Sequence, residues 1–187
     1  MERVIHEIFP VPIYEVKLGL DTEKIQSYFE EYQSVHDSAD KSNVGGYQSH
    51  DIQLNNPILQ PLIAKLVYHS SNFRGNTQVI ANMWFNINQY KDSNASHIHP
   101  FSVYSGVYYI TTPENCGLIQ FEHPAQDLLM YWGTIAKGES ASSSICKYPA
   151  IEDTLYIFPS WLKHSVLPNK NQEEKRISIS FNTSNGA

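Results

Sequence analysis

From residue 79 onward, apolar and polar residues alternate in short runs, and Gly, Pro, Asn or Asp separates one run from the next. Successive side chains of an extended strand point to opposite faces, so this alternation predicts β-strands. The predicted strands are Ile80–Tyr90, Val103–Thr111, Gly117–Glu122, Ser144–Lys147, Thr154–Phe158 and Arg176–Asn182. Many short strands joined by turns are typical of a sandwich or a barrel.

Ahead of these strands, the apolar residues follow a helical period. Asp21 is a suitable N-cap for a helix that runs to about Ser34, with Ile25, Phe29 and Tyr32 on one face. A second helix is predicted from Asn55 or Asn56 to about Phe73, where Arg74-Gly75-Asn76 ends it. Its apolar stripe consists of Ile58, Leu62, Leu66 and Tyr68 or His69.

The remaining segments read as an edge strand and loops. Residues 8–18 form a strand that two prolines interrupt, which is tolerated mainly at a sheet edge. Residues 37–51 and 92–96 are polar and predict loops, and residues 127–144 form a long insertion of the kind that supplies substrate contacts. We expect one domain, 1–187, in which residues 1–78 add the edge strand and two helices, packed on an outer sheet, to a β core at 79–183.

The composition is that of a globular protein, with 41% hydrophobic and 17% charged residues. The net charge of −6 gives no reason to expect nucleic acid as a partner, because phosphate binding needs clustered Lys and Arg. No apolar run is long enough to span a membrane, and the start of the chain is too polar for a signal peptide. We therefore expect a soluble, cytoplasmic protein without a membrane partner, whose two cysteines, Cys116 and Cys146, are reduced and buried.

Three histidines carry the candidate chemistry. In His97-Ile98-His99 the two imidazoles point to the same side of an extended chain, so both can reach one metal ion. His164 follows the strand Leu155–Phe158 after a short loop and supplies a third imidazole. Three ligands on one face leave other coordination positions open, as an iron(II) oxygenase requires, although imidazole also suits zinc and copper. Trp84 and Trp161 flank this site in the sequence; we expect both to pack in the core, and Trp161 is also a candidate for the substrate mouth.

The last strand adds a second observation. Strict alternation puts Arg176, Ser178 and Ser180 on one face and Ile177, Ile179 and Phe181 on the other. An arginine that faces into a barrel needs an anionic partner, and a dicarboxylate could pair with both arms of the guanidinium while Ser178 donates a further hydrogen bond. The alternative is a solvent-exposed face on which Arg176 pairs with Glu173 or Glu174.

Taken in order, four phrases resemble those of the 2-oxoglutarate/iron(II) oxygenase superfamily. They are His97-x-His99-Pro100, Ser105-Gly106-Val107-Tyr108-Tyr109, Phe158-Pro159-Ser160-Trp161-Leu162-x-His164 and Arg176-x-Ser178. The combination is most similar to a poorly characterised branch of marine bacteria and their viruses, so a viral protein would act in the host cytoplasm. The resemblance implies a mainly β chain with flanking helices, folded as a double-stranded β-helix, the cupin-like jelly-roll barrel.

By that resemblance, His97 and His164 hold Fe(II), and Arg176 with Ser178 binds 2-oxoglutarate as the co-substrate. Asn88-x-Tyr90 resembles a strand in which the tyrosine bonds the co-substrate. The chain would use O₂ to hydroxylate a protein residue or a small metabolite that the sequence does not identify.

One position departs from the superfamily pattern, because His99 stands where its carboxylate ligand is expected. The site is then a three-histidine centre, or Glu122 replaces His99 as the third ligand, or two histidines and water complete it. Two other functions stay open: a cupin-like module that binds a metal or ligand without turnover, and a three-histidine dioxygenase that does not use 2-oxoglutarate. Exposed edge strands also leave a homodimer open.

Overall fold

The computed structural model describes residues 10–125 and 144–186, which form two helices and eleven strands. The helices are α1 (Thr22–Val35) and α2 (Gln60–Arg74). The strands are β1 (Tyr14–Lys17), β2 (Asn43–Val44), β3 (Tyr47–Gln48), β4 (Gln78–Asn88), β5 (Ser93–His97), β6 (Tyr104–Thr111), β7 (Leu118–Glu122), β8 (Ile145–Pro149), β9 (Thr154–Pro159), β10 (His164–Val166) and β11 (Arg176–Asn185).

The strands form two antiparallel sheets. One has six strands in the order β1-β9-β6-β11-β4-β3, and the other has five in the order β2-β5-β10-β7-β8. The predicted edge position of the first strand is confirmed, because β1 pairs with β9 at the rim of the six-stranded sheet. Within the described ranges the hydrogen-bonded order stays open in both sheets and does not close into a barrel.

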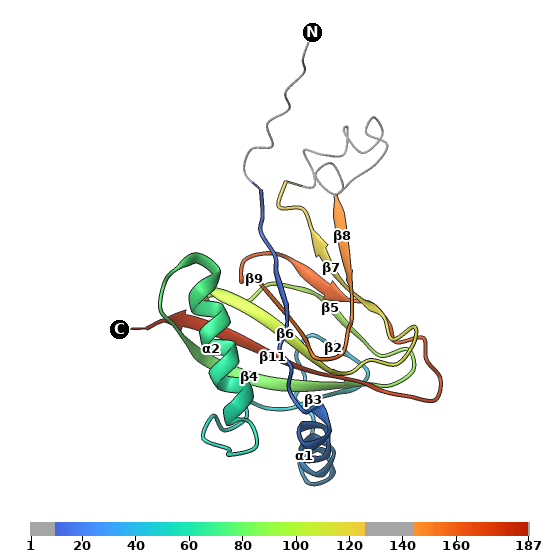
Figure 1. Cartoon of the computed structure of the whole chain (residues 1–187). Coiled ribbons are helices and arrows are strands. Elements are labelled where there is room, and N and C mark those ends of the chain that lie inside the picture. Colours follow the sequence, from blue (N-terminus) through green and yellow to red (C-terminus); the bar gives the residue numbers. More distant parts are fainter. Residues whose placement is uncertain (1–9, 126–143, 187) are drawn as a thin grey trace.

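The six-stranded sheet is the middle layer of three. On β6, Tyr108 and Ile110 belong to the core cluster that contains the helix residues, whereas Val107 and Tyr109 belong to the cluster shared with the five-stranded sheet. This division follows from the alternation of side chains along each strand. Both helices contact the six-stranded sheet, α2 through β4 and α1 through β6, as the sequence predicts. In Figure 1, α2 lies at the left and α1 at the bottom, whereas β7 and β8 lie in the upper part.

The first helix forms as predicted, and the second begins later than predicted. The Asp21 side chain accepts a hydrogen bond from the Glu23 backbone N–H at the start of α1, and Gly75 ends α2 in a left-handed conformation. However, Asn56 caps only a short turn by accepting from the Ile58 N–H at 2.9 Å. The helix starts at Gln60 with a proline in its first turn, a position where the missing N–H of proline costs nothing. Ile58 thus lies ahead of the helix and is exposed, and Tyr68, within the helix, is exposed as well, so neither belongs to the apolar stripe.

Both segments that were predicted as loops contain strands. Residues 37–51 include β2 and β3, and residues 93–97 form β5. These strands are short and polar, so only their pairing with β4, β5 and β10 defines them, and no local pattern reveals them. His164, predicted in a loop, begins β10. Residues 8 and 9 of the predicted edge strand and residues 127–143 of the predicted insertion lie outside the described residues.

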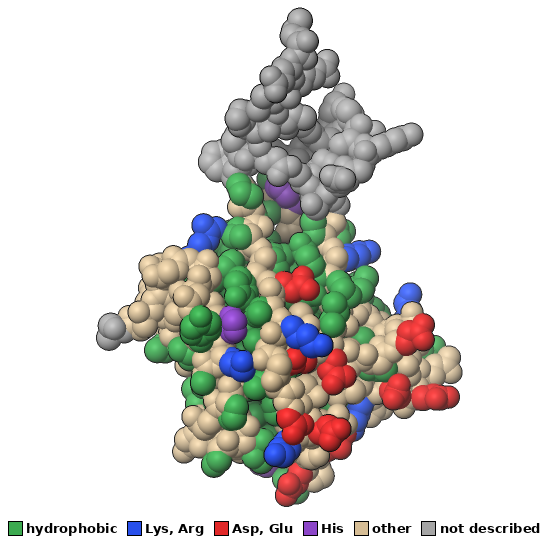
Figure 2. Space-filling model, viewed as in Figure 1, with side chains coloured by type: hydrophobic (Ala, Val, Ile, Leu, Met, Phe, Trp, Pro, Cys, Tyr) green, Lys and Arg blue, Asp and Glu red, His purple; other side chains and the backbone are tan. Residues whose placement is uncertain are grey.

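Charge and cysteine placement complete the description. On the face shown in Figure 2, Asp and Glu side chains gather over the lower part of the molecule, and Lys and Arg side chains are more widely spread. Cys116 is buried, as predicted, but Cys146 is only half-buried, and no disulfide joins the two. Neither α1 nor α2, the helices of the described ranges, has the length and apolar character needed to cross a membrane.

Candidate metal centre

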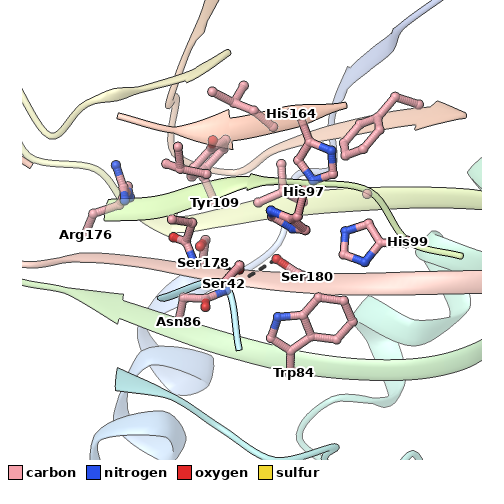
Figure 3. A pocket seen from close by; sticks show the side chains of 16 residues that line it. Ser42, Trp84, Asn86, His97, His99, Tyr109, His164, Arg176, Ser178 and Ser180 are labelled. Carbon is pink, nitrogen blue, oxygen red and sulfur yellow. Dashed lines mark hydrogen bonds between the residues drawn. The ribbon is translucent and has the colours of Figure 1, made fainter. Parts of the chain in front are cut away.

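Three imidazoles from two neighbouring strands converge at one end of a cavity between the sheets. His97 ends β5 and pairs with His164, the first residue of β10, and His99 follows two residues later. The potential ligand atoms of the three side chains all lie within 4.8 Å of one another. Figure 3 shows the rings facing a common centre, with ring centroids 4.4 Å apart for His97 and His164. The structure therefore brings together the three histidines that the sequence predicts as ligands.

Hydrogen bonds to the backbone orient two of these rings. Nδ1 of His97 donates to the Ala95 carbonyl at 2.7 Å, and Nδ1 of His164 donates to the Leu162 carbonyl at 2.9 Å. A carbonyl oxygen can only accept, so the proton of each neutral ring resides on Nδ1. The lone pair of each Nε2 is then available for a metal ion, which is the arrangement found when a second partner fixes the tautomer of a ligating histidine.

Burial keeps the three rings neutral. It lowers the pKa of His164 to about 3, and the neighbouring His97 lowers that pKa further. Burial also lowers the pKa of His99 to about 4, again with a contribution from His97. The pKa of His97 is lowered by burial as well, although its hydrogen bond to Ala95 acts in the opposite direction. Because a metal ion binds only the neutral imidazole, burial favours the metal-binding form of all three rings.

The guanidinium of Arg176 lies at the other end of the cavity (Figure 3). The side chain is 1% exposed, and its Nη1 donates to the Cys116 carbonyl and, at 3.4 Å, to the Leu167 carbonyl. Nε and Nη2 have no hydrogen-bond partner among the described residues. The alternative pairing with Glu173 or Glu174 is thus wrong. A buried cation with unpaired donors is costly unless an anion binds to it.

The side chains of Ser178 and Tyr109 also line the cavity and carry hydroxyl groups. Ser178 pairs in register with Tyr109 on β6 and with Asn86 on β4, and all three side chains line the cavity. Burial raises the pKa of Tyr109 to about 12, so the phenol keeps its proton, and its oxygen has no partner within the described part of the chain. Tyr109 is a donor that sequence reasoning missed. The only sequence signal for it is the alternation of β6, which puts residues 107 and 109 on the inward face.

Asn88 and Tyr90, predicted to bind the co-substrate, do not line this cavity. Tyr90 follows the end of β4, is 43% exposed, and its ring lies 5.1 Å from Lys91 Nζ. Asn88 is buried beside Arg176 in the ladder, where its backbone carbonyl accepts from Asn169. The structure does not bring these two residues into the cavity: β4 ends at Asn88, so Tyr90 does not continue the face on which Asn86 lies.

The alternative third ligand, Glu122, is held by other partners. One carboxylate oxygen accepts a hydrogen bond from Ser96, and the other forms an ion pair with Lys163 at 3.0 Å. Glu122 is accordingly not part of the three-histidine group. Trp84 packs in the core as predicted, with its ring centroid 5.5 Å from that of His99, but Trp161 is 53% exposed and does not.

This geometry agrees with a comparison against protein families. A sequence model described as "Putative 2OG-Fe(II) oxygenase" matches residues 82–182, which is more than half of the chain. The chain belongs to this 2OG-Fe(II) oxygenase family. The family depends on Fe(II) and 2-oxoglutarate, so the predicted enzyme class and cofactors are confirmed. A search of curated proteins found no match.

Solved structures show the same fold at low sequence identity. A prolyl-4-hydroxylase of Pseudomonas putida is 13% identical with a TM-score of 0.63, and the alignment covers 95% of the oxygenase and 94% of that chain. HygX of Streptomyces hygroscopicus, solved with nickel and 2-oxoglutarate bound, is 10% identical with a TM-score of 0.64, and the alignment covers 94% of the present chain and 83% of HygX. The viral collagen prolyl hydroxylase of Paramecium Bursaria Chlorella virus-1 is 11% identical with a TM-score of 0.59, and the alignment covers 91% of the present chain and 94% of the viral enzyme. The predicted jelly-roll class is thereby confirmed.

Proposed function

We propose that this oxygenase is a hydroxylase in which His97, His99 and His164 bind Fe(II) and Arg176 binds the distal carboxylate of 2-oxoglutarate. Three neutral nitrogen donors on one side of a cation leave the remaining coordination positions for the co-substrate and O₂. The iron and 2-oxoglutarate, when bound, supply the activation of O₂ and the oxidation of a C–H bond. Everything else in the reaction is positioning by the chain.

One observation carries this proposal: the donors that lack partners are those that a dicarboxylate needs. Nε and Nη2 of Arg176 and the hydroxyl of Tyr109 are buried and unpaired among the described residues. A planar guanidinium can bind a carboxylate through two parallel hydrogen bonds. The Tyr109 phenol and the Ser178 hydroxyl line the same cavity and can donate to the same anion. An anion between these donors and the histidines would offset the cost of burying the guanidinium.

The side chains have distinct tasks in this scheme. The backbone bonds of His97 and His164 keep their Nε2 atoms directed at the metal. The Arg176 guanidinium, held by the Cys116 and Leu167 carbonyls, fixes how deep the co-substrate lies. Val107, Ile119 and Phe158 line the cavity between the sheets and exclude water from the reacting centre. His99, a neutral ligand in place of a carboxylate, leaves the metal site one charge more positive and favours an anionic co-substrate.

The two competing functions do not account for the guanidinium. A metal-binding module without turnover, or a three-histidine dioxygenase that does not use 2-oxoglutarate, has no need of a buried cation in the same cavity. Arg176 is 1% exposed, and two of its three guanidinium nitrogens are unpaired among the described residues. This cost is explained only when an anionic co-substrate is part of the reaction.

An anaerobic titration with Fe(II) and 2-oxoglutarate tests the proposal. We expect the weak visible charge-transfer absorption of an iron chelate of 2-oxoglutarate, and we expect His164→Ala to lose it while His36→Ala, a change at the exposed end of α1, keeps it. Addition of air should then yield succinate. A folded wild-type protein that shows no absorption band and forms no succinate would refute the assignment.

A further inference from the structure

A second, wider cleft opens onto the same histidines and runs along the edge of β5. Its lining includes five consecutive residues, Ala95–His99, and two further groups, residues 39, 41 and 42 and residues 48–51. Side chains of consecutive residues point alternately to opposite faces of a strand. The consecutive strand residues Ala95, Ser96 and His97 can all border one cleft when the cleft follows the edge of β5, and Ile98 and His99 continue this wall beyond the end of the strand.

The neighbouring strand leaves this edge uncovered. β2 pairs with Ser93 and Asn94, and the bond from the Ala95 N–H to the Ser42 carbonyl extends this pairing by one residue. Beyond that point the cleft occupies the side of Ser96–His99 on which β2 lies. Elsewhere in the lining, the carbonyl oxygen of the Gln48 side chain is buried and has no partner among the described residues. A guest with its own row of N–H and C=O groups would complement both.

Two residues after His99, which lines the cleft, the chain carries an aromatic ring that it does not use internally. Phe101 is fully exposed, and its φ of 67° lies in the left-handed region that bulky residues rarely adopt. Its ring buries nothing in the fold, and glycine would suit its backbone better. Strain of this kind, at a residue two positions after a candidate ligand, points to a role outside the folded chain.

A second exposed aromatic residue lies in the adjoining turn. The His99 N–H donates to the Ser160 carbonyl at 3.0 Å, and the Ser160 N–H donates to the Val103 carbonyl at 3.3 Å, so these bonds join the two turns. Trp161, the residue after Ser160, is 53% exposed. Both exposed aromatics are therefore on the two segments that carry the three histidines. Exposed apolar residues beside a catalytic cavity indicate a surface that binds a partner.

We infer that the substrate of this oxygenase is an extended polypeptide segment, which pairs with the edge at Ser96–Ile98, between the bonded N–H groups of Ala95 and His99, and places an apolar side chain against Phe101 and Trp161. The inference rests on the proposed function and specifies its substrate class. Strand addition supplies main-chain hydrogen bonds, and side-chain contacts supply specificity. The cleft offers both, and it leads the bound segment directly past His97 and His99. A small metabolite held inside the cleft would leave the Phe101 ring in solvent and its strained backbone unexplained.

The test is a selection of random twelve-residue peptides, displayed on their encoding RNA, against the full chain loaded with Zn(II) and 2-oxoglutarate. Enriched peptides are synthesised with a fluorescent label, and their affinity is measured by anisotropy. We expect a recurrent sequence containing an apolar residue and increased protection of amides within Ser96–Ile98 from hydrogen exchange when the peptide binds; the amides of Ala95 and His99 are already bonded within the chain. Phe101→Gly should weaken binding at least tenfold, and Tyr68→Ala, which removes another exposed aromatic on α2, should leave it unchanged.

Phe101→Gly should unfold at the same temperature as wild type or higher, so that lost peptide binding cannot be attributed to misfolding. The inference is overturned if no sequence is enriched, or if the enriched peptides bind Phe101→Gly as tightly as wild type. It is also overturned if the substitution instead abolishes a dimer of this chain or binding to phosphatidylcholine–phosphatidylglycerol vesicles. The Fe(II) and 2-oxoglutarate absorption is measured on a metal-free sample of the same protein after anaerobic addition of Fe(II), and it separates the cases: with the band present only the peptide inference fails, and without it the proposed function fails.

Discussion

Replacing Arg176 by glutamine should remove most of the affinity for 2-oxoglutarate and leave Fe(II) binding intact. Two donors of the guanidinium, Nε and Nη2, are buried without a partner among the described residues and are free to bind a carboxylate. Each charge-assisted hydrogen bond contributes about 1.5–3 kcal/mol. Together the two bonds amount to about 3–6 kcal/mol, and since about 1.4 kcal/mol is a factor of ten, the dissociation constant should rise about 10²- to 10⁴-fold.

Arg176→Lys separates charge from geometry. Lysine keeps the positive charge but lacks the planar fork, so it can make one strong contact where arginine makes two. We expect it to lose about half of the binding free energy at stake, about 1.5–3 kcal/mol, and to lie between wild type and Arg176→Gln. Arg74→Gln, in the last turn of α2, is the matched control for removal of an arginine from another part of the chain.

The assay is the anaerobic titration of each Fe(II)-loaded protein with 2-oxoglutarate, followed through the visible absorption of the chelate. Fe(II) affinity is measured separately, and thermal unfolding of the metal-free proteins shows whether each variant is folded. An unchanged dissociation constant for 2-oxoglutarate in a folded Arg176→Gln protein would refute the reasoning. A parallel loss of Fe(II) binding would also refute it, because the guanidinium and the histidines lie at opposite ends of the cavity.

Three further predictions follow from the site. His99→Asp should retain Fe(II) but weaken 2-oxoglutarate binding, because the substitution adds a negative charge beside an anion. An unchanged absorption maximum in the anaerobic titration would contradict the role of His99 as a metal ligand. Gly117→Ala should destabilise the protein by about 1–3 kcal/mol and weaken 2-oxoglutarate binding, because the added Cβ would lie 2.3 Å from the Leu167 carbonyl oxygen and 2.8 Å from Arg176 Nη1. Thermal unfolding measures the loss of stability. Gly75→Ala is the control for the backbone effect alone, because Gly75 has a φ of 79° and a Cβ there would have nothing within 4 Å. Burial is the main reason why the pKa values of His164 and His99 are lowered to about 3 and about 4. As the pH falls below about 6.5, only the unfolded chain takes up protons on these rings, so the metal-free protein should lose stability by at most about 1.4 kcal/mol per pH unit for each histidine. Urea unfolding at about pH 7 and about pH 5 checks this, and equal stabilities would contradict it.

Local chemistry was sufficient to predict the features that depend on few neighbours. The cap at Asp21 and the left-handed Gly75 follow from the preferences of single residues, and both are present. The inward face of β11 follows from strict alternation, which puts Arg176, Ser178 and Ser180 in the cavity. The convergence of the three histidines required more than periodicity, because His164 is brought beside His97 by strand pairing across a long sequence separation.

The sequence-based predictions differ from the structure where strand pairing or the end of a strand decides the local conformation. β2 and β3 are strands of two residues whose polar sequences resemble a loop, and only β5 and β4 make them strands. In the sequence, Tyr90 continues the alternation of inward-facing residues, but in the structure β4 ends at Asn88. Tyr109 was missed for the opposite reason: a buried strand tyrosine looks like core until its hydroxyl is found beside a guanidinium without a partner among the described residues.

The strand β11 has one further consequence, which concerns what changes the chain can tolerate. Its odd-numbered residues Ile177, Ile179 and Phe181 are fully buried against the helices, and the residues between them form the cofactor cavity. An insertion or deletion of one residue in this strand would exchange the two faces. It would place the guanidinium in the hydrophobic core and isoleucine side chains in the cofactor cavity. Such a shift would cost folding and catalysis together, whereas substitutions on either side can alter one property at a time. Length in this strand should therefore vary far less than residue type.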